Sequence, residues 1–243
     1  INTTVSGSGS SSTIGADTSG QNNHFTSSAI LASDCAMPDC PENNFCIASA
    51  IFRKAFRTQT QTSSKGNLKF TAPSADNSIV HASMVINEIA SQGGVYFEAR
   101  VISGGASNNS YIGVLDVADD LTSATGANTW NIKAVLDYLR GYFYKDGSSS
   151  DDYRSVTGIP YTTDDIIGIA INSDGKFFMH KNGVYFNQLA SGSQQNPSTG
   201  SNEMVTLDFA NYKYVPFIDG EAAIYFNFGQ DSTFGGQETA GSN

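Results

Sequence analysis

The apolar and polar positions between Asp164 and Gln188 predict three short strands joined by two tight turns. Residues 166–172 are apolar and rich in isoleucine, which is typical of a buried strand. Asp174-Gly175 and Asn182-Gly183 are dipeptides that readily adopt the positive-φ conformations of two-residue hairpin turns. Because apolar residues resume after each turn, this stretch predicts an antiparallel meander.

From Asn67 onward, apolar segments alternate with turn residues at fairly regular spacing. In one segment Phe97 and Val101 share a face while Glu98 and Arg100 share the other, as in a half-buried strand. The predicted strands are Asn67 to Thr71, Ile79 to Ile86, Val95 to Ile102, Tyr111 to Val117, Gly141 to Tyr144, Ile166 to Asn172, Lys176 to His180, Val184 to Phe186, Val205 to Phe209, Val215 to Ile218 and Ala223 to Phe228. This pattern predicts an all-β sandwich or barrel.

Helical patterns are confined to two short segments, residues 48–56 and residues 131–138. Residues 1–21 form a Gly/Ser/Thr-rich tract with little apolar area, which predicts either a flexible linker or an arm that adds to a sheet edge of a neighbouring subunit. Residues 22–66 predict an irregular collar that contains the cysteines, and residues 67–243 predict the sandwich.

Composition narrows the possible partners. The 243-residue chain has a formal net charge of −10 and 11% aromatic residues. Clustered Lys and Arg, which phosphate backbones require, are lacking, so we expect no nucleic-acid binding. No apolar run in the sequence is long enough to span a bilayer, so we expect no membrane insertion. The chain starts at Ile1 without an initiator methionine, and we expect a segment of a longer protein or a processed product.

The three cysteines, Cys35, Cys40 and Cys46, lie close together in the predicted collar. Their spacing matches no zinc-binding pattern, and no histidine is near them in the sequence. One disulfide with one free thiol and three buried thiols are both consistent with the odd number of cysteines.

Several short motifs follow one another in the order and spacing of a SPRY domain. They include Gly-x-Tyr-x-Glu at Gly94 to Glu98, Lys181-Asn182-Gly183, and Asn-Phe-Gly at Asn227 to Gly229. The resembling segments are residues 94–99, 111–114, 141–142, 165–170, 177–183, 214–217 and 225–229. The chain departs from the pattern at Phe97, where tryptophan is usual, and at Asn172-Ser173, where an acidic turn residue is common. The resemblance implies a concanavalin-like sandwich of two antiparallel sheets.

A narrower resemblance concerns the flanking segments. Residues 17–25, 32–34 and 41–45 resemble the connector that follows a laminin-G-like module in tail and fibre proteins of bacteriophages, and residues 227–236 resemble the end of the same module. This resemblance implies a virion or otherwise extracellular protein, a homo-oligomer that contacts other virion or fibre subunits. Since a fold alone assigns no function, the residues must be weighed separately.

Catalytic and metal-binding motifs are weak. His24, His81 and His180 are far apart in the sequence, and neither Gly-x-Ser-x-Gly nor His-Glu-x-x-His occurs. The aspartate pairs resemble the two carboxylates of glycosidases, but their Ser- and Gly-rich surroundings favour solvated loops. Those pairs are Asp119-Asp120, Asp151-Asp152 and Asp164-Asp165. Asp116, Asp119 and Asp120 are candidate ligands for calcium, a minority alternative to a protein without cofactors. We therefore expect no enzymatic activity.

The candidate binding residues are aromatic and polar side chains in or near predicted loops. Aromatic rings beside Asn and Asp stack on sugars or anchor protein partners, although any single one is more often buried in a core. The candidates are Trp130, Tyr138, Tyr142, Tyr144, Tyr153, Asp116 and Asn128. We expect them to form a recognition surface, with loops 103–110, 118–130 and 145–163 at one end of the sandwich.

These observations favour a module that recognises a host surface molecule. A glycan is the favoured ligand, and a protein is the other ligand considered. The alternative is a structural assembly subunit whose N-terminal arm docks on its neighbour. An intracellular adaptor of the SPRY type is disfavoured by the phage-like connector.

Overall fold

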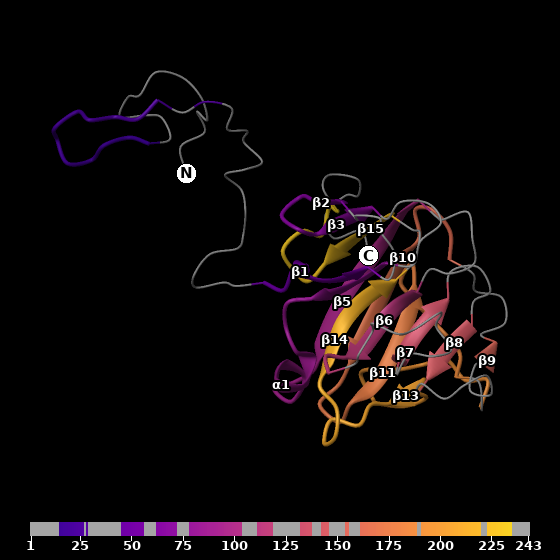
Figure 1. Ribbon diagram of the computed structural model, residues 1–243. Coiled ribbons are helices and arrows are strands. Elements are labelled where there is room, and N and C mark those ends of the chain that lie inside the picture. Colours follow the sequence, from indigo (N-terminus) through magenta and orange to yellow (C-terminus); the bar gives the residue numbers. More distant parts are fainter. Residues whose placement is uncertain are drawn as a thin grey trace. The chain divides into compact units, whose positions relative to one another are not determined.

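The computed structural model describes residues 15–26, 28, 45–55, 62–71, 78–103, 111–118, 132–137, 142–145, 154–155, 161–188, 191–219 and 223–234. The chain divides into two compact units, Ile1–Phe45 and Cys46–Asn243. The second unit is an antiparallel β-sandwich of two sheets (Figure 1).

Sheet A contains seven strands in the described part of the chain, and each strand is antiparallel to its neighbours. Their order across the sheet is β1 (Ala48–Ala55), β4 (Ser78–Ala82), β14 (Tyr214–Asp219), β6 (Tyr111–Asp116), β7 (Ile132–Asp137), β8 (Tyr142–Lys145) and β9 (Arg154–Ser155).

Sheet B contains eight strands among the described residues and is also antiparallel throughout. Seven lie in the order β12 (Val184–Tyr185), β11 (Lys176–Lys181), β10 (Ile166–Ile171), β5 (Val95–Ser103), β15 (Ala223–Asn227), β3 (Lys69–Thr71) and β2 (Thr62–Ser64), and β13 (Val205–Thr206) also pairs with β11.

The predicted all-β class is confirmed, while both predicted helical segments are wrong. Residues 48–55 form β1 and residues 132–137 form β7, each hydrogen-bonded to neighbouring strands of sheet A. Segments this short have weak intrinsic preferences, and pairing within a sheet overrides them. A five-residue helix, α1 (Ile86–Ala90), instead follows β4, where the sequence had predicted that the strand continues to Ile86.

The core lies between the sheets and is built by alternation along the strands. Ile167, Ile169 and Ile171 of β10 all point inward and are at most 1% exposed. The inward residues of the neighbouring strands, Phe97, Ala99, Val101, Phe177, Met179, Ile224 and Phe226, pack with them against Ile112, Val114, Tyr214 and Ile218 of sheet A. Complete burial of one such isoleucine contributes about 1.5–3 kcal/mol, so this layer supplies most of the stability.

The outer face of sheet B departs from the expected half-buried pattern. Glu98 and Arg100 do point away from the core, as predicted, but they are only 6% and 7% exposed. Part of this face is covered by a second apolar cluster that contains Leu68, Ile166, Tyr225 and Phe234. Buried charged groups on the outer face therefore need internal partners.

The predicted meander is confirmed as β10-β11-β12. Asn182 and Gly183 both have positive φ, 52° and 80°, as the two central residues of a type I′ turn require. At the first turn the Asn172 side chain accepts hydrogen bonds from the backbone N–H of Asp174 (3.1 Å) and of Lys176 (2.9 Å). An amide oxygen therefore fulfils the turn-stabilising role at the position where SPRY domains commonly have an acid.

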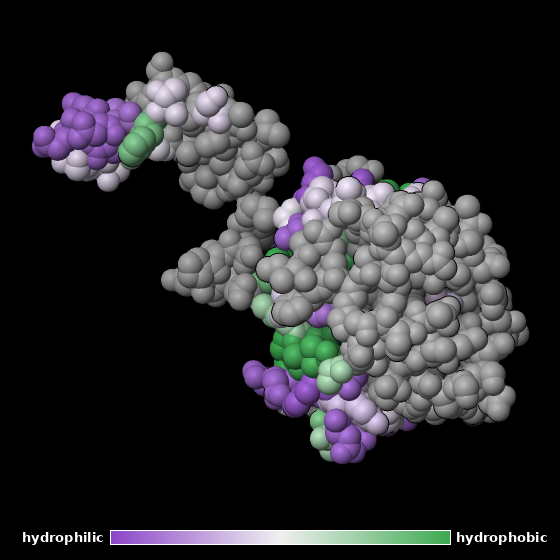
Figure 2. All heavy atoms as spheres, viewed as in Figure 1, coloured by the Kyte–Doolittle hydropathy of each residue, from purple (hydrophilic) through white to green (hydrophobic). Residues whose placement is uncertain are grey.

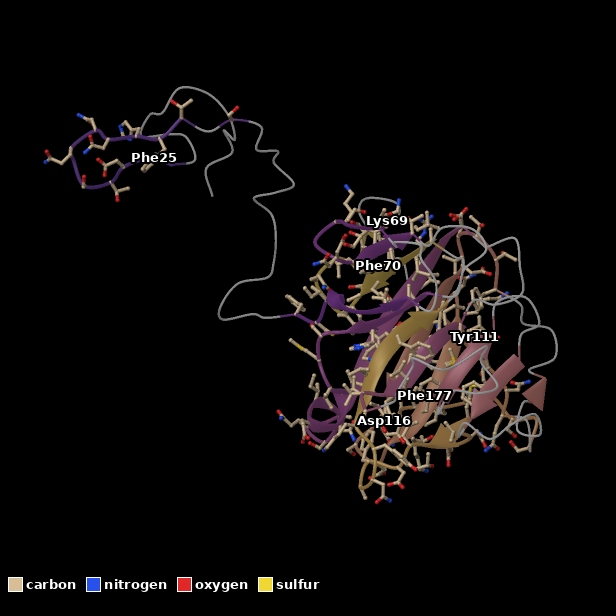
Figure 3. The ribbon with its side chains drawn as sticks, in the orientation of Figure 1. Phe25, Lys69, Phe70, Tyr111, Asp116 and Phe177 are labelled. Atoms are coloured by element: carbon tan, nitrogen blue, oxygen red, sulfur yellow. The ribbon has the colours of Figure 1, made fainter. Side chains whose placement is uncertain are left out.

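The register of sheet A separates the two ends of the sandwich. Asp116 pairs with Tyr214 and Leu115 with Ile132, near α1, whereas Tyr111 pairs with Asp137 and Asp219 at the opposite end. Figure 3 shows Tyr111 and Asp116 at opposite ends of β6. The three loops predicted to share one end lie largely outside the described residues, and what the structure places is their flanking residues: Ser103 and Tyr111, at the ends of loop 103–110, lie away from α1. Connectors 118–130 and 145–163 both start at the α1 end.

In the first unit, the described residues form a turn around Asp17. Its carboxylate accepts hydrogen bonds from the backbone N–H of Ser19 (2.8 Å) and of Asn23 (2.9 Å). Hydrogen bonds from Ser19 and Asn23 lower the pKa of Asp17 to about 2. The backbone N–H of Phe25 closes the turn on the Gly15 carbonyl at 3.0 Å, and the Phe25 side chain is 76% exposed (Figure 3).

One buried side chain fills a gap in sheet B. Along one edge of β11, pairing changes from β12 at His180 to β13 at Phe177. Between them, the Met179 backbone N–H donates to Gln195 Oε1 at 2.8 Å, and Gln195 is 3% exposed. A glutamine side chain thus takes the place of a strand carbonyl.

We expect Gln195→Ala to destabilise the sandwich by about 1–3 kcal/mol, because it leaves a buried backbone donor without an acceptor. Urea denaturation measures the change in the free energy of unfolding. Gln194→Ala is the matched control, since Gln194 is exposed. Equal effects of the two substitutions would contradict the proposed role of Gln195.

Candidate functional site

A row of five residues crosses the outer face of sheet B, and we call it the polar row. In register, Asn227 of β15 lies beside Glu98 of β5, then Gly168 of β10, His180 of β11 and Tyr185 of β12. Four of these residues come from segments that carry the SPRY resemblance. The motifs are distant in sequence, and the sheet brings them together.

The side chains of the row form a chain of hydrogen bonds that includes Tyr96. The Tyr96 hydroxyl lies 2.6 Å from Glu98 Oε1 and 2.7 Å from His180 Nε2. Asn227 Nδ2 donates to Glu98 Oε2 at 3.0 Å. Asn227 Oδ1 in turn accepts the backbone N–H of Gly229 at 2.9 Å. Both carboxylate oxygens of Glu98 are therefore occupied by protein donors.

These contacts assign the tautomer of His180. The Gly183 backbone N–H donates to Nδ1 at 3.1 Å, so Nδ1 carries a lone pair. Since the single Tyr96 proton goes to Glu98, Nε2 carries the imidazole proton and donates it to the Tyr96 oxygen. The ring is neutral in this arrangement, and protonation of Nδ1 would break the bond to Gly183.

Burial and charge act on the ionisable groups of this site in a consistent way. Burial lowers the pKa of His180, although the nearby Glu98 carboxylate opposes that effect. Burial also raises the pKa of Tyr96, and its hydrogen bond to Glu98 raises it further. The site therefore holds a neutral histidine and a neutral tyrosine around one buried carboxylate.

Gly168 makes room for the histidine ring. A Cβ atom on Gly168 would lie 1.9 Å from His180 Nε2 and 2.4 Å from Cε1, far inside any allowed contact. The imidazole therefore lies over the backbone of β10. A glycine at this point is required by the close approach of the ring, independently of backbone conformation.

A second polar cluster links the start of β10 to the turn after β11. Asp165 Oδ1 accepts from Asn182 Nδ2 at 2.7 Å, and Asp165 Oδ2 accepts from the Thr162 backbone N–H at 2.7 Å. Asn182 Oδ1 accepts the Ile166 N–H at 2.8 Å. Burial alone would raise the pKa of Asp165, but hydrogen bonds from Thr162 and Asn182 and the charge of Lys181 lower it on balance.

The adjacent aspartates do not act as a carboxylate pair. Asp164 Oδ1 lies 2.8 Å from Arg100 Nη2, whereas Asp165 is directed to Asn182 and Thr162. The Asp164 side chain is 71% exposed, in agreement with the predicted solvated loop, whereas the Asp165 side chain is only 14% exposed and is held by Asn182 and Thr162.

Asp116 is the one predicted binding residue whose side chain the structure describes. Its Oδ1 accepts the backbone N–H of Lys213 (3.2 Å) and of Ala118 (3.3 Å), so it fastens β6 to the segment before β14. Tyr142 and Tyr144 lie in β8, on either side of the buried Phe143, but their side chains are outside the description. Trp130, Tyr138, Tyr153 and Asn128 lie outside the described residues.

Exposed apolar side chains gather at the α1 end. Ile89, Val117 and Tyr212 are 40%, 44% and 36% exposed. Asn87 holds this region together, since its side chain bonds the Tyr212 carbonyl (2.8 Å) and the Tyr214 N–H (2.8 Å). Figure 2 shows an apolar area bordered by hydrophilic residues next to α1.

Cys46 is the cysteine whose side chain the structure describes. Cys46 has a free, half-buried thiol, and burial raises its pKa. Cys35, Cys40, Asp119 and Asp120 lie outside the described residues. Within the described ranges, no three His, Cys, Asp or Glu side chains come together as metal ligands would, and no helix is long and apolar enough to cross a bilayer.

Sequence reasoning missed the role of Tyr96 and His180. In the sequence, Tyr96 is recognisable only as part of the Gly-x-Tyr-x-Glu motif. A single histidine in a predicted strand indicates no specific role. The available signal was the alternation in Ile167-Gly168-Ile169-Ala170-Ile171, which places small residues outward between large inward ones. Only the register shows that aromatic rings occupy the space that the small residues leave.

Comparison with known proteins supports the fold. No protein-family model matches the sequence, and no curated protein matches it. The structure is similar to the SPRY domain of human HERC1, with a TM-score of 0.53 and 13% identity over 76% of this chain and 99% of that chain. A human SPRY domain gives a TM-score of 0.48 and 12% identity, with 71% and 98% covered.

The carbohydrate recognition domain of Emp46p gives a TM-score of 0.42 and 8% identity, covering 73% of this chain and 87% of that chain. At such identities a likeness concerns the fold alone. The chain is therefore a two-sheet sandwich that resembles SPRY domains.

We expect Gly168→Ala to destabilise the protein by about 1–3 kcal/mol, because the new methyl group must displace the His180 ring. A double-mutant cycle with His180→Ala tests this cause, and urea denaturation provides the free energies. The cost of Gly168→Ala should largely vanish once the ring is gone. An unchanged cost in the His180→Ala background would contradict the assignment.

Stability should decrease as the pH falls below 6.5, the ordinary pKa of histidine. Because the folded-state pKa of His180 is lowered, the unfolded state binds more protons in this range, and the stability present above pH 6.5 is lost on acidification. Thermal unfolding between pH 7.5 and 5 should show this dependence in the wild type and in the control His24→Gln. His180→Gln should flatten it, and a full slope in that variant would refute the explanation.

Proposed function

We propose that this chain is a non-enzymatic recognition module that binds a glycan. The observation that carries the proposal is the internal saturation of the described polar clusters. The oxygens of Glu98 and Asp165 and the nitrogens of His180 are bonded to protein groups. A general acid or base must reach a proton of its substrate, and these groups are engaged by protein partners instead.

Exposed rings and aliphatic side chains are what the described surface offers to a ligand. Tyr96 is 47% exposed, and the α1 end presents Ile89, Val117 and Tyr212. Such groups contribute apolar contact and stacking rather than acid–base chemistry. A net charge of −10 disfavours polyanionic ligands, which leaves neutral glycans as the favoured class.

The setting that we propose is a virion surface or another extracellular particle, with a host surface glycan as the ligand and further virion or fibre subunits as partners. This part of the proposal rests on the resemblance of residues 17–25, 32–34, 41–45 and 227–236 to bacteriophage tail and fibre modules.

Assembly is the second candidate function. The apolar area at the α1 end favours assembly. Ile89 and Val117 are exposed there, and burying their side chains between subunits would stabilise an oligomer. In that case the module is a homo-oligomeric building unit, and the tract of residues 1–21 is the arm that docks on a neighbour.

We expect the purified full-length chain to bind a subset of neutral glycans on an array and to release no product from them, as judged by mass spectrometry. Light scattering of the same sample reports the oligomeric state. Formation of large oligomers without glycan binding would favour assembly over recognition. Hydrolysis of a bound glycan would overturn the non-enzymatic proposal.

A further inference from the structure

Tyr96 presents its ring to solvent and keeps its hydroxyl inside. The residue is 47% exposed, yet its hydroxyl is bonded to Glu98 and His180, which are 6% and 4% exposed. A tyrosine that serves as a polar contact shows the opposite arrangement, with its hydroxyl in water. What Tyr96 offers a ligand is therefore a rigid ring face.

The Tyr96 ring lies beside the His180 ring, with 5.9 Å between the ring centroids. Its plane makes an angle of 20° with the His180 ring, which itself lies over Gly168. The cross-strand neighbour of Tyr96 on β10 is Ala170, so a small side chain again lies beneath. The two small outward residues of β10 thus leave space for the His180 and Tyr96 rings, and we call these two rings the aromatic floor.

Tyr185 forms a side wall of this floor. Its ring meets His180 edge-on, at 73° and with 5.1 Å between the ring centroids. The second apolar cluster covers a different part of this face, around Ile166 and Tyr225, and leaves Tyr96 accessible.

The hydrogen bond to Glu98 also tunes the ring. Because the hydroxyl donates to a buried carboxylate at 2.6 Å, electron density shifts toward the oxygen and the ring, and the ring face becomes more negative. Such a face attracts positively polarised C–H groups. One face of a pyranose presents several of these groups in an array about as wide as one aromatic ring.

We propose that Tyr96 is the stacking residue of a binding site for a neutral hexopyranose, with Tyr185 at its side. The inference rests on the proposed glycan-binding function and locates it on sheet B, away from the predicted loops. A cation site is less well matched, because aromatic cages surround a cation with several ring faces, whereas this site offers one floor and one edge-on wall.

The test uses the full chain and a panel of methyl glycosides of glucose, galactose, mannose and N-acetylglucosamine, with affinities from NMR titration. We expect at least one glycoside to bind. Tyr96→Leu should weaken that binding about tenfold or more, because it removes the flat ring. Tyr96→Phe should retain most of the affinity, and the control Phe25→Leu, at an exposed aromatic ring of the first unit, should retain all of it.

A second measurement does not depend on the folding of a variant. In the wild-type protein with isotope-labelled tyrosines, the ring signals of Tyr96 should shift during the glycoside titration. Glycoside binding without this shift, or with full affinity in folded Tyr96→Leu, overturns the Tyr96 site but leaves the proposed function intact. No glycan binding on the array or in solution overturns both. Binding of tetramethylammonium but of no glycoside at Tyr96 overturns the sugar assignment.

Discussion

The sandwich depends on how β10 divides its residues between two faces. Ile167, Ile169 and Ile171 fill the space between the sheets, and Gly168 and Ala170 face the other way. Because β10 pairs with both β5 and β11, large residues on its outer face would push apart the side chains of these neighbours. The small residues let those side chains lie across the strand, and the polar row follows from this constraint.

The polar row shows how a charge can be kept on the outer face of a sheet at low exposure. Glu98 receives donors from β5 itself and from β15, while His180 completes the chain from β11. A buried carboxylate without such donors would cost several kcal/mol, on the order of the penalty for an unpaired buried ion. With them, three strands (β15, β5 and β11) and the turn at Gly183 are joined through one network. The polar-row residues that carry the SPRY resemblance thus have structural roles in sheet B.

Surfaces available to a ligand are distinct from the hydrogen bonds that hold sheet B together. If motif residues hold the sheet together, recognition must come from what the network presents and from surfaces outside the motifs. Tyr96 belongs to both groups, since its hydroxyl serves the network and its ring faces solvent. The α1 end is a separate surface, where Asp116 and Asn87 fasten backbone segments and exposed apolar residues lie around them. The two proposals, glycan recognition at Tyr96 and assembly at the α1 end, therefore concern different faces and can be tested separately.

The amino-acid sequence by itself determined the all-β class, most of the strands and the β10-β11-β12 meander. These are local properties: alternation sets which residues face the core, and Asn182-Gly183 adopts its turn whatever surrounds it. β1, β7 and α1 were predicted incorrectly because their segments have weak preferences that pairing and packing override. Only the tertiary structure decided that Glu98, Gly168, His180 and Asn227 are neighbours, that Ser103 and Tyr111 lie away from α1, and that Tyr96 is exposed. The reason is physical: register and the accessibility of a side chain depend on strands far apart in the chain, and no local pattern encodes them.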